Sequence, residues 1–156
     1  ARWSYYTLGD YKLSGSQFIS DKENGPYSLQ HSIDVFSKAF DATVKKYTSI
    51  EVPIHLITQP PHQKYQPESA YFFIGKGIGS IETMSVKRAD FQKLNGISIN
   101  VFSSHEDKIN VYNITDLFCD EFVCPIGDPT RSFYYDNNHL SAYGALKLEG
   151  IIDTIF

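Results

Sequence analysis

Residues 28–47 carry the most regular hydrophobic pattern of the chain, and this pattern limits the fold more than any other feature. Apolar side chains recur there at spacings of three or four residues: Leu29, Ile33, Phe36, Phe40, Val44 and Tyr47. This is the period of an amphipathic helix that buries one face. Ser28 can cap the first turn. We therefore predict a helix that begins after Ser28 and runs to about Tyr47.

Short apolar segments alternate with helical patterns along the rest of the chain. Residues 51–58 and 108–114 are predicted strands, and a second helix is predicted over 86–103. Ser141 can cap a last helix with Ala145, Leu148, Ile152 and Ile155 on its buried side. Alternation of this kind is typical of βα units and of a parallel sheet covered on both faces. The fold class is therefore predicted to be α/β, as one domain over residues 1–156.

The remaining segments are predicted to be short strands or irregular. Residues 2–7 are rich in aromatic side chains and are predicted to form a strand, and residues 132–135 a short extended piece. Residues 8–27 have many Gly, Ser, Asp and Lys residues and are predicted to be a loop. After Pro60 and Pro61, the glycines of residues 75–79 favour a loop or a broken helix up to about residue 85.

The composition fits one globular domain and excludes several classes of function. With 156 residues, 42% of them hydrophobic, the chain can bury a sizeable core without many disulfides or a structural metal ion. Its apolar runs are far shorter than the ~20 residues of a membrane span. The net charge of −4 is spread along the chain without a basic stripe, so nucleic acid is not an expected partner. Residues 75–80 do not meet a nucleotide-binding fingerprint, and no cofactor or metal ion is expected.

Residues 135–139, Tyr-Asp-Asn-Asn-His, are the strongest local indication of chemistry. Asp136 and His139 are three residues apart in a predicted turn. There the carboxylate can accept a hydrogen bond from one ring nitrogen and leave the other free to take a proton from a nucleophile. The alternative is that Asp136 only forms the turn and His139 is an exposed residue before the helix, because Asp-x-x-His is a short pattern.

A family resemblance is carried by residues 117–124 (Leu-Phe-Cys-Asp-Glu-Phe-Val-Cys) and 133–145 (Phe-Tyr-Tyr-Asp-Asn-Asn-His-Leu-Ser-Ala-Tyr-Gly-Ala). These stretches resemble the C-terminal end of an SGNH (GDSL-like) hydrolase domain. The version they resemble is fused behind the multi-pass acyltransferase-3 membrane domain of bacterial O-acetyltransferases. Residues 1–4 are similar to a central strand of those domains, and residues 52–61 to a later one. The resemblance implies a flavodoxin-like three-layer α/β/α sandwich, with Asp136 and His139 as the acid and base of a Ser-His-Asp triad.

The chain departs from this family at the nucleophile. The family's Ser lies in a Gly-Asp-Ser block after the first strand, and this sequence has no such block. Residues 9–11 (Gly-Asp-Tyr) and 127–129 (Gly-Asp-Pro) match only its first two positions and are interpreted as turns. Together with the start at Ala1 without Met, this suggests a domain that is incomplete at its N-terminus. A processed chain would look the same. Alone the chain is expected to be nearly inactive, and self-association that completes the sheet is a further expectation.

Four other residues enter through the resemblance. It places Arg2 and Trp3 at a strand end bordering the active-site cleft, where Trp3 can stack on a sugar and Arg2 can contact the acceptor. A core Trp beside a surface Arg is the alternative. Cys119 and Cys124 are the only cysteines, and a disulfide between them would contribute about 2 kcal/mol at most. Two reduced thiols in a cytosolic protein are the alternative. The resemblance favours the disulfide and an oxidising, extracytoplasmic location.

The resemblance implies a function for the intact protein. It would move an acyl group, with acetyl favoured, from a donor to a sugar hydroxyl of a surface polysaccharide of the O-antigen or lipopolysaccharide type. Its partner would be a covalently linked membrane acyltransferase domain, and it would lie on the periplasmic side of the bacterial inner membrane. The alternatives are a non-catalytic carbohydrate-binding or scaffold domain of the same fold, a secreted carbohydrate esterase, or an unrelated cytosolic α/β domain.

Overall fold

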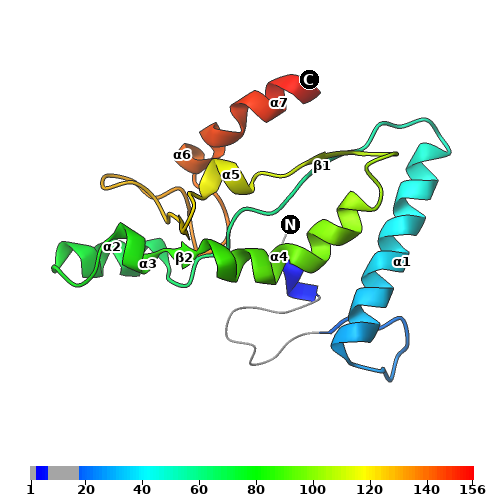
Figure 1. Cartoon of the computed structure of the whole chain (residues 1–156), viewed down its shortest axis with the longest axis horizontal. Helices are drawn as coiled ribbons and strands as arrows, with labels where there is room; N and C mark the ends of the chain where they lie inside the picture. Colours follow the sequence, from blue (N-terminus) through cyan, green and yellow to red (C-terminus); the bar gives the residue numbers. More distant parts are fainter. Residues whose placement is uncertain (1–2, 7–17) are drawn as a thin grey trace. The chain divides into compact units, whose positions relative to one another are not determined.

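The computed structural model describes residues 3–6 and 18–156. These residues form two compact units, which we describe separately: the first comprises residues up to 59 and residues 94–112, and the second residues 60–93 and 113–156. The long helix α4 (Arg88–Ser103) contributes its first residues to the second unit and the rest to the first (Figure 1). The single domain over residues 1–156 stays a prediction.

The first unit contains the helix predicted from the hydrophobic period. It is α1 (Leu29–Thr48), and the Ser28 side chain caps it by accepting a hydrogen bond from the backbone N–H of His31 at 3.2 Å. The second predicted helix is confirmed as α4, which continues through Gly96. α1 and the part of α4 from Leu94 onward bury side chains in the first unit. Residues 18–27 before α1 are irregular, as predicted.

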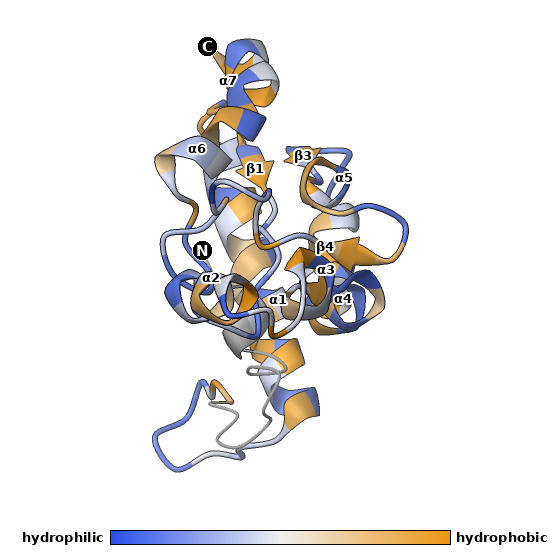
Figure 2. Ribbon diagram, turned by 90° about the vertical axis from the view of Figure 1, so that its left-hand side faces the viewer, coloured by the Kyte–Doolittle hydropathy of each residue, from blue (hydrophilic) through white to orange (hydrophobic). Residues whose placement is uncertain are grey.

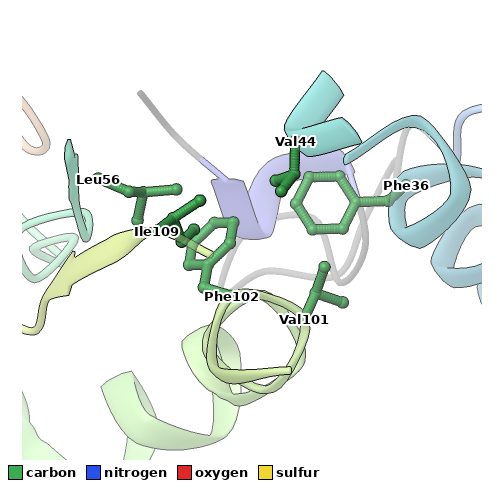
Figure 3. Close-up of a cluster of buried hydrophobic side chains, with 6 residues drawn as sticks. All are labelled: Phe36, Val44, Leu56, Val101, Phe102 and Ile109. Atoms are coloured by element: carbon green, nitrogen blue, oxygen red, sulfur yellow. The ribbon is translucent and has the colours of Figure 1, made fainter. Parts of the chain in front are cut away.

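The two strands of the first unit are shorter than predicted. β1 (His55–Ile57) pairs in parallel with β3 (Asn110–Tyr112), with Leu56 opposite Val111. The parallel pairing agrees with the predicted βα organisation. The core between the strands and helices consists of Phe36, Val44, Leu56, Val101, Phe102 and Ile109 (Figure 3).

The strand predicted over residues 2–7 is wrong where the structure describes it, because residues 3–6 form the short 3-10 helix η1 (Trp3–Tyr6). Tertiary contacts override the local preference for a strand. The Trp3 ring packs against Phe36 and Phe102, with centroid distances of 6.4 and 5.3 Å. The backbone N–H of Ser4 donates to Oε1 of Gln59 at 3.1 Å. Residues 1–2 and 7–17 lie outside the described residues.

The second unit begins with two helices in the region predicted to be a loop or a broken helix. α2 (Pro67–Gly75) starts at a proline, which is favourable at the first helical position. α3 (Ile81–Met84) follows after a turn in which Gly77 and Gly79 have positive φ. β2 (Val86–Lys87) pairs antiparallel with β4 (Val123–Cys124), and the short helix α5 (Thr115–Phe118) precedes β4. The core here is built on Ala70, Ile126 and Tyr134.

The last helix is capped as predicted but broken into three pieces: α6 (Ala142–Ala145), η2 (Leu146–Leu148) and α7 (Glu149–Ile155). The predicted buried side is wrong for Ala145 and Ile152, which are exposed. No residue of α7 is buried against the described part of the chain. Figure 2 shows that this helix carries both hydrophilic and hydrophobic residues.

The structure is a mixture of helices and small sheets, in agreement with the predicted α/β class. One two-stranded sheet is parallel and the other antiparallel. The three-layer sandwich is not confirmed and stays a prediction. None of the helices in the described ranges is both long enough and apolar enough to cross a membrane.

Candidate functional site

The turn that carries Asp136 and His139 is closed by the Asp136 carboxylate. Its Oδ1 accepts hydrogen bonds from the backbone N–H groups of Asn138 and His139, at 2.8 and 2.7 Å. Its Oδ2 lies 2.7 Å from Nδ1 of the His139 ring. Asp commonly closes turns in this way, because its short side chain reaches the backbone two and three residues further on. One carboxylate therefore shapes the turn and holds the imidazole.

The charge of Asp136 fixes which ring nitrogen of His139 carries a proton. Burial raises the pKa of Asp136, but the hydrogen bonds from the His139 ring and from the two backbone N–H groups outweigh it and lower the pKa to about 2. Asp136 is therefore a carboxylate at neutral pH and can only accept hydrogen bonds. Nδ1 of His139 must then be the donor, and in the neutral ring Nε2 is left as the base.

On each side of the turn, neighbouring residues point to opposite faces, one towards the core and one towards the solvent. Tyr134 pairs with Leu140 in an antiparallel bridge, and both side chains pack in the core of the second unit. The backbone N–H of Tyr135 donates to the carbonyl of His139 at 2.8 Å, which makes these two residues opposite neighbours. Opposite neighbours in an antiparallel pair share a face. The side chain of His139 is 73% exposed and Tyr135 is 80% exposed, so both open to solvent.

Two other His–Asp pairs in the described residues have a different geometry. Nε2 of His31 lies 3.1 Å from Asp21, and Nε2 of His105 lies 3.4 Å from Asp41. In both pairs the carboxylate contacts the outer ring nitrogen. At His139 it contacts Nδ1 at the shorter distance of 2.7 Å, and Nε2 has no partner among the described residues. This is the orientation that a general base requires.

The start of α6 is fastened to the strand-like segment before the turn. The backbone N–H of Ser141 donates to the carbonyl of Phe133 at 3.0 Å, and its hydroxyl donates to the carbonyl of Ser132 at 2.9 Å. The same hydroxyl accepts from the N–H of Gly144 at 3.1 Å. A Cβ atom at Gly144 would overlap the carbonyl oxygen of Phe133, so only glycine allows this approach. The segments before and after the turn of Asp136 and His139 are thereby joined to each other.

Residues 127–129, interpreted above as a turn, form a tight bend. Both carboxylate oxygens of Asp128 in this bend accept hydrogen bonds. Oδ1 of Asp128 accepts from the hydroxyl and N–H of Thr130 and from the N–H of Arg131, and Oδ2 accepts from the Tyr143 hydroxyl at 2.7 Å. The Thr130 hydroxyl and these other donors hold the pKa of Asp128 far below its usual range. Tyr71 donates to the Asp128 carbonyl. Burial, with Asp128 and Tyr143 nearby, raises the pKa of Tyr71 to about 12. The hydrogen bonds from Tyr71 and Tyr143 therefore connect this bend to α2 and α6 within the second unit.

Cys119 and Cys124 form the disulfide that the resemblance favoured. It closes a small loop in which Oδ1 of Asp120 accepts from the backbone N–H groups of Phe122 and Val123, both at 2.8 Å. Arg88, at the start of α4, donates from its guanidinium to the Asp120 carbonyl and forms an ion pair with Asp116. The loop is therefore held by a covalent bond and by one arginine.

The structure brings Asp136 and His139 together in the second unit. Trp3 lies in the first unit, packed on the aromatic rings of its core, and Arg2 lies outside the described residues. Across residues 3–6 and 18–156 no group of three or more His, Cys, Asp or Glu side chains could hold a metal ion.

A carboxylate that orients a histidine with its outer nitrogen exposed is characteristic of hydrolases and acyltransferases with a catalytic triad. A protein-family model described as "SGNH domain (fused to AT3 domains)" matches residues 1–154. The chain belongs to this family. Neither the curated proteins nor the solved structures gave a significant match. Membership makes this an acyltransferase-associated, hydrolase-like domain, and the fusion points to a membrane-associated parent protein.

Proposed function

We propose that this domain supplies the base and the orienting acid for acyl transfer to a sugar hydroxyl of a surface polysaccharide. The observation that supports this most is the 2.7 Å contact between Oδ2 of Asp136 and Nδ1 of His139, with Nε2 open to solvent. This sequence has no Gly-Asp-Ser block, which carries the nucleophilic Ser in the family. We therefore propose that the Ser comes from outside the chain.

The proposed reaction has two halves. His139 Nε2 takes the proton of the Ser hydroxyl as its oxygen attacks the carbonyl carbon of the acyl donor, and the imidazolium then protonates the departing group of the donor. The acyl group is now an ester of the Ser. In the second half His139 takes the proton of a sugar hydroxyl, whose oxygen attacks this ester, and returns the proton to the Ser. Asp136 remains ionised throughout and stabilises the imidazolium.

The exposed ring of Tyr135 favours a sugar as the acyl acceptor over a small molecule. Its ring is 80% exposed and lies on the same face as the His139 side chain. An exposed aromatic ring beside the base can stack against the C–H face of a pyranose and bring one hydroxyl to Nε2. We propose this role for Tyr135; the ring of Trp3 packs against Phe36 and Phe102 in the first unit.

The proposal places the domain on the periplasmic side of the bacterial inner membrane, tethered by its acyltransferase domain. The fusion described by the family model and the disulfide between Cys119 and Cys124 support this location, because disulfides persist in oxidising compartments. No role is proposed for a cofactor.

The test uses the full-length parent protein that carries this chain. Hydrolysis of p-nitrophenyl acetate and acetyl transfer to the cell's own surface polysaccharide are measured for the wild type, His139→Ala and Asp136→Asn. Removal of one triad member is expected to lower kcat by about 10⁴-fold. Asp21→Asn is the matched control, because it alters a His–Asp pair of the wrong geometry and should leave kcat unchanged.

Two results would contradict the proposal. One is an activity that does not depend on His139, and the other is a parent sequence without a Gly-Asp-Ser block. Either result, combined with binding of the polysaccharide, would favour the non-catalytic carbohydrate-binding domain. Hydrolysis of acetylated polysaccharide without transfer would favour an esterase.

A further inference from the structure

Gln63 is a buried residue that contacts the catalytic turn from outside it. It is 1% exposed, and its backbone N–H donates to the carbonyl of Asn137 at 2.7 Å. Asn137 follows Asp136 directly. The other hydrogen bonds of residues 136–139 that the described structure contains stay within residues 135–139. The bond from Gln63 is therefore the external hydrogen-bond anchor of the turn.

The side chain of Gln63 is itself fixed at both ends. Nε2 donates to the carbonyl of Cys124 at 3.0 Å, and Oε1 accepts from the backbone N–H of Val86 at 3.1 Å. Val86 and Cys124 are opposite neighbours in the β2–β4 pair, and both are fully buried. Cys124 is also one half of the disulfide. A primary amide suits this position because its nitrogen can donate to the carbonyl of Cys124 while its oxygen accepts from the N–H of Val86.

We infer that Gln63 is a positioning residue of the proposed active site, which fixes the Asp136–His139 turn relative to the β2–β4 pair. The inference rests on the proposed function only for its catalytic consequence. Through its side chain Gln63 is locked to two strands, and through its backbone it holds the turn. Without the side-chain bonds, the backbone N–H of Gln63 is free to shift, and the turn loses its anchor at Asn137. His139 would then sample orientations in which Nδ1 leaves Asp136.

The chain provides a matched control for this inference in Gln59. Gln59 is also a buried glutamine, 3% exposed, and its amide also makes side-chain hydrogen bonds, in this case to Ser4 in the first unit. Gln63→Met and Gln59→Met both replace a buried amide by an apolar side chain of similar length. Only Gln63→Met should affect the turn.

The first experiment is NMR on the 156-residue chain. In the wild type, a scalar coupling across the hydrogen bond from the Gln63 nitrogen to the Asn137 carbonyl carbon is expected. In Gln63→Met, the amides of Asn138 and His139 should exchange with solvent at least tenfold faster, and the ring-nitrogen shifts of His139 should show loss of the Nδ1–H form. Gln59→Met should leave both readouts at wild-type values. If Gln63→Met does not fold, Gln63→Glu takes its place, since it keeps the acceptor for Val86 and loses the donor to Cys124.

The second experiment measures kinetics in the full-length parent. Gln63→Met should lower kcat about 10- to 100-fold with little change in KM, because substrate contacts are retained. The inference is overturned if the wild-type coupling is absent, or if a folded Gln63 variant keeps the His139 signature and amide protection of the wild type. If the variant releases His139 but the activity of the parent does not depend on His139, the positioning role stands and the proposed function fails.

Discussion

Gly144 is the position at which a single added methyl group should most clearly destabilise the second unit. An alanine Cβ there would overlap the carbonyl oxygen of Phe133, and the carbonyl carbon and Cα of Phe133 would lie at only 2.8 and 3.0 Å. Ordinary contacts of carbon atoms begin near 3.5 Å. The backbone around Phe133 would have to move away from α6 by about an ångström.

The size of the effect follows from what that movement breaks. The bonds from Ser141 to the carbonyls of Phe133 and Ser132, at 3.0 and 2.9 Å, join the same two segments. Each contributes about 1 kcal/mol net, and overpacking typically costs about 1–3 kcal/mol. The better helix propensity of Ala offsets up to about 1 kcal/mol. We expect Gly144→Ala to lower the free energy of unfolding by about 2–4 kcal/mol.

The measurement is urea unfolding followed by far-UV circular dichroism, with hydrogen exchange to locate the loss in the second unit. Gly150→Ala in α7 is the control, because a Cβ at Gly150 meets nothing within 4 Å. That control should be neutral or up to about 1 kcal/mol more stable. Equal stability of the two variants would refute the reasoning, since both gain the same methyl group on the same kind of backbone.

Three further predictions concern the site and its surroundings. The pKa of Asp136 is about 2, below the ~3.9 of an unfolded chain, so its stabilisation is complete above pH ~4 and lost as the pH falls towards 2. Asp136→Asn should therefore cost about 1 kcal/mol at neutral pH, after allowance for solvent screening, and only a small fraction of that at about pH 2, by urea unfolding at both values. Tyr135→Ala in the parent should raise KM for the sugar acceptor about tenfold with a smaller change in kcat, whereas Tyr65→Ala, also exposed, should not. Replacing Cys119 and Cys124 by Ser should lower the free energy of unfolding by about 2 kcal/mol, and reductant should affect only the wild type.

Each of these predictions has an outcome that would contradict it. A difference between Asp136→Asn and the wild type that is as large at pH 2 as at neutral pH would mean that the carboxylate charge is not its cause. Equal acceptor KM values for Tyr135→Ala and Tyr65→Ala would remove the proposed stacking role. A wild-type protein insensitive to reductant would mean that the loop is held by Arg88 and its own hydrogen bonds without help from the disulfide.

The helix α1 was predictable because its apolar side chains repeat with one period over twenty residues and its cap is local. α2 has no such stripe: Tyr71, Phe72, Phe73 and Ile74 are consecutive, so periodicity could not identify it, and the nearby prolines and glycines suggested a loop. The last helix is split into α6, η2 and α7 with neither a proline nor a residue of positive φ at the breaks, so no local pattern identifies them.

The candidate site likewise has residues that the sequence predicts and one that it does not. Asp136 and His139 lie within one turn, so their spacing alone predicts that the carboxylate reaches the ring. Gln63 is far from them in the sequence and acts through its backbone N–H, for which residue type gives no signal. The resemblance places Trp3 at the cleft, and its ring packs against the core of the first unit, which is the contact that the alternative interpretation predicts.

The opposite facing of neighbouring residues on each side of the Asp136–His139 turn makes the length of this turn as important as its composition. Tyr134 and Leu140 face the core, while Tyr135 and His139 face the solvent. Side chains in paired segments alternate with a period of two, so a shift of the pairing register by one residue exchanges the two faces. An insertion or deletion between Asp136 and His139 that causes such a shift would direct the imidazole into the core and expose a leucine. Homologous or engineered versions of this turn should therefore accept substitutions at Asn137 and Asn138 far more readily than any change in residue number.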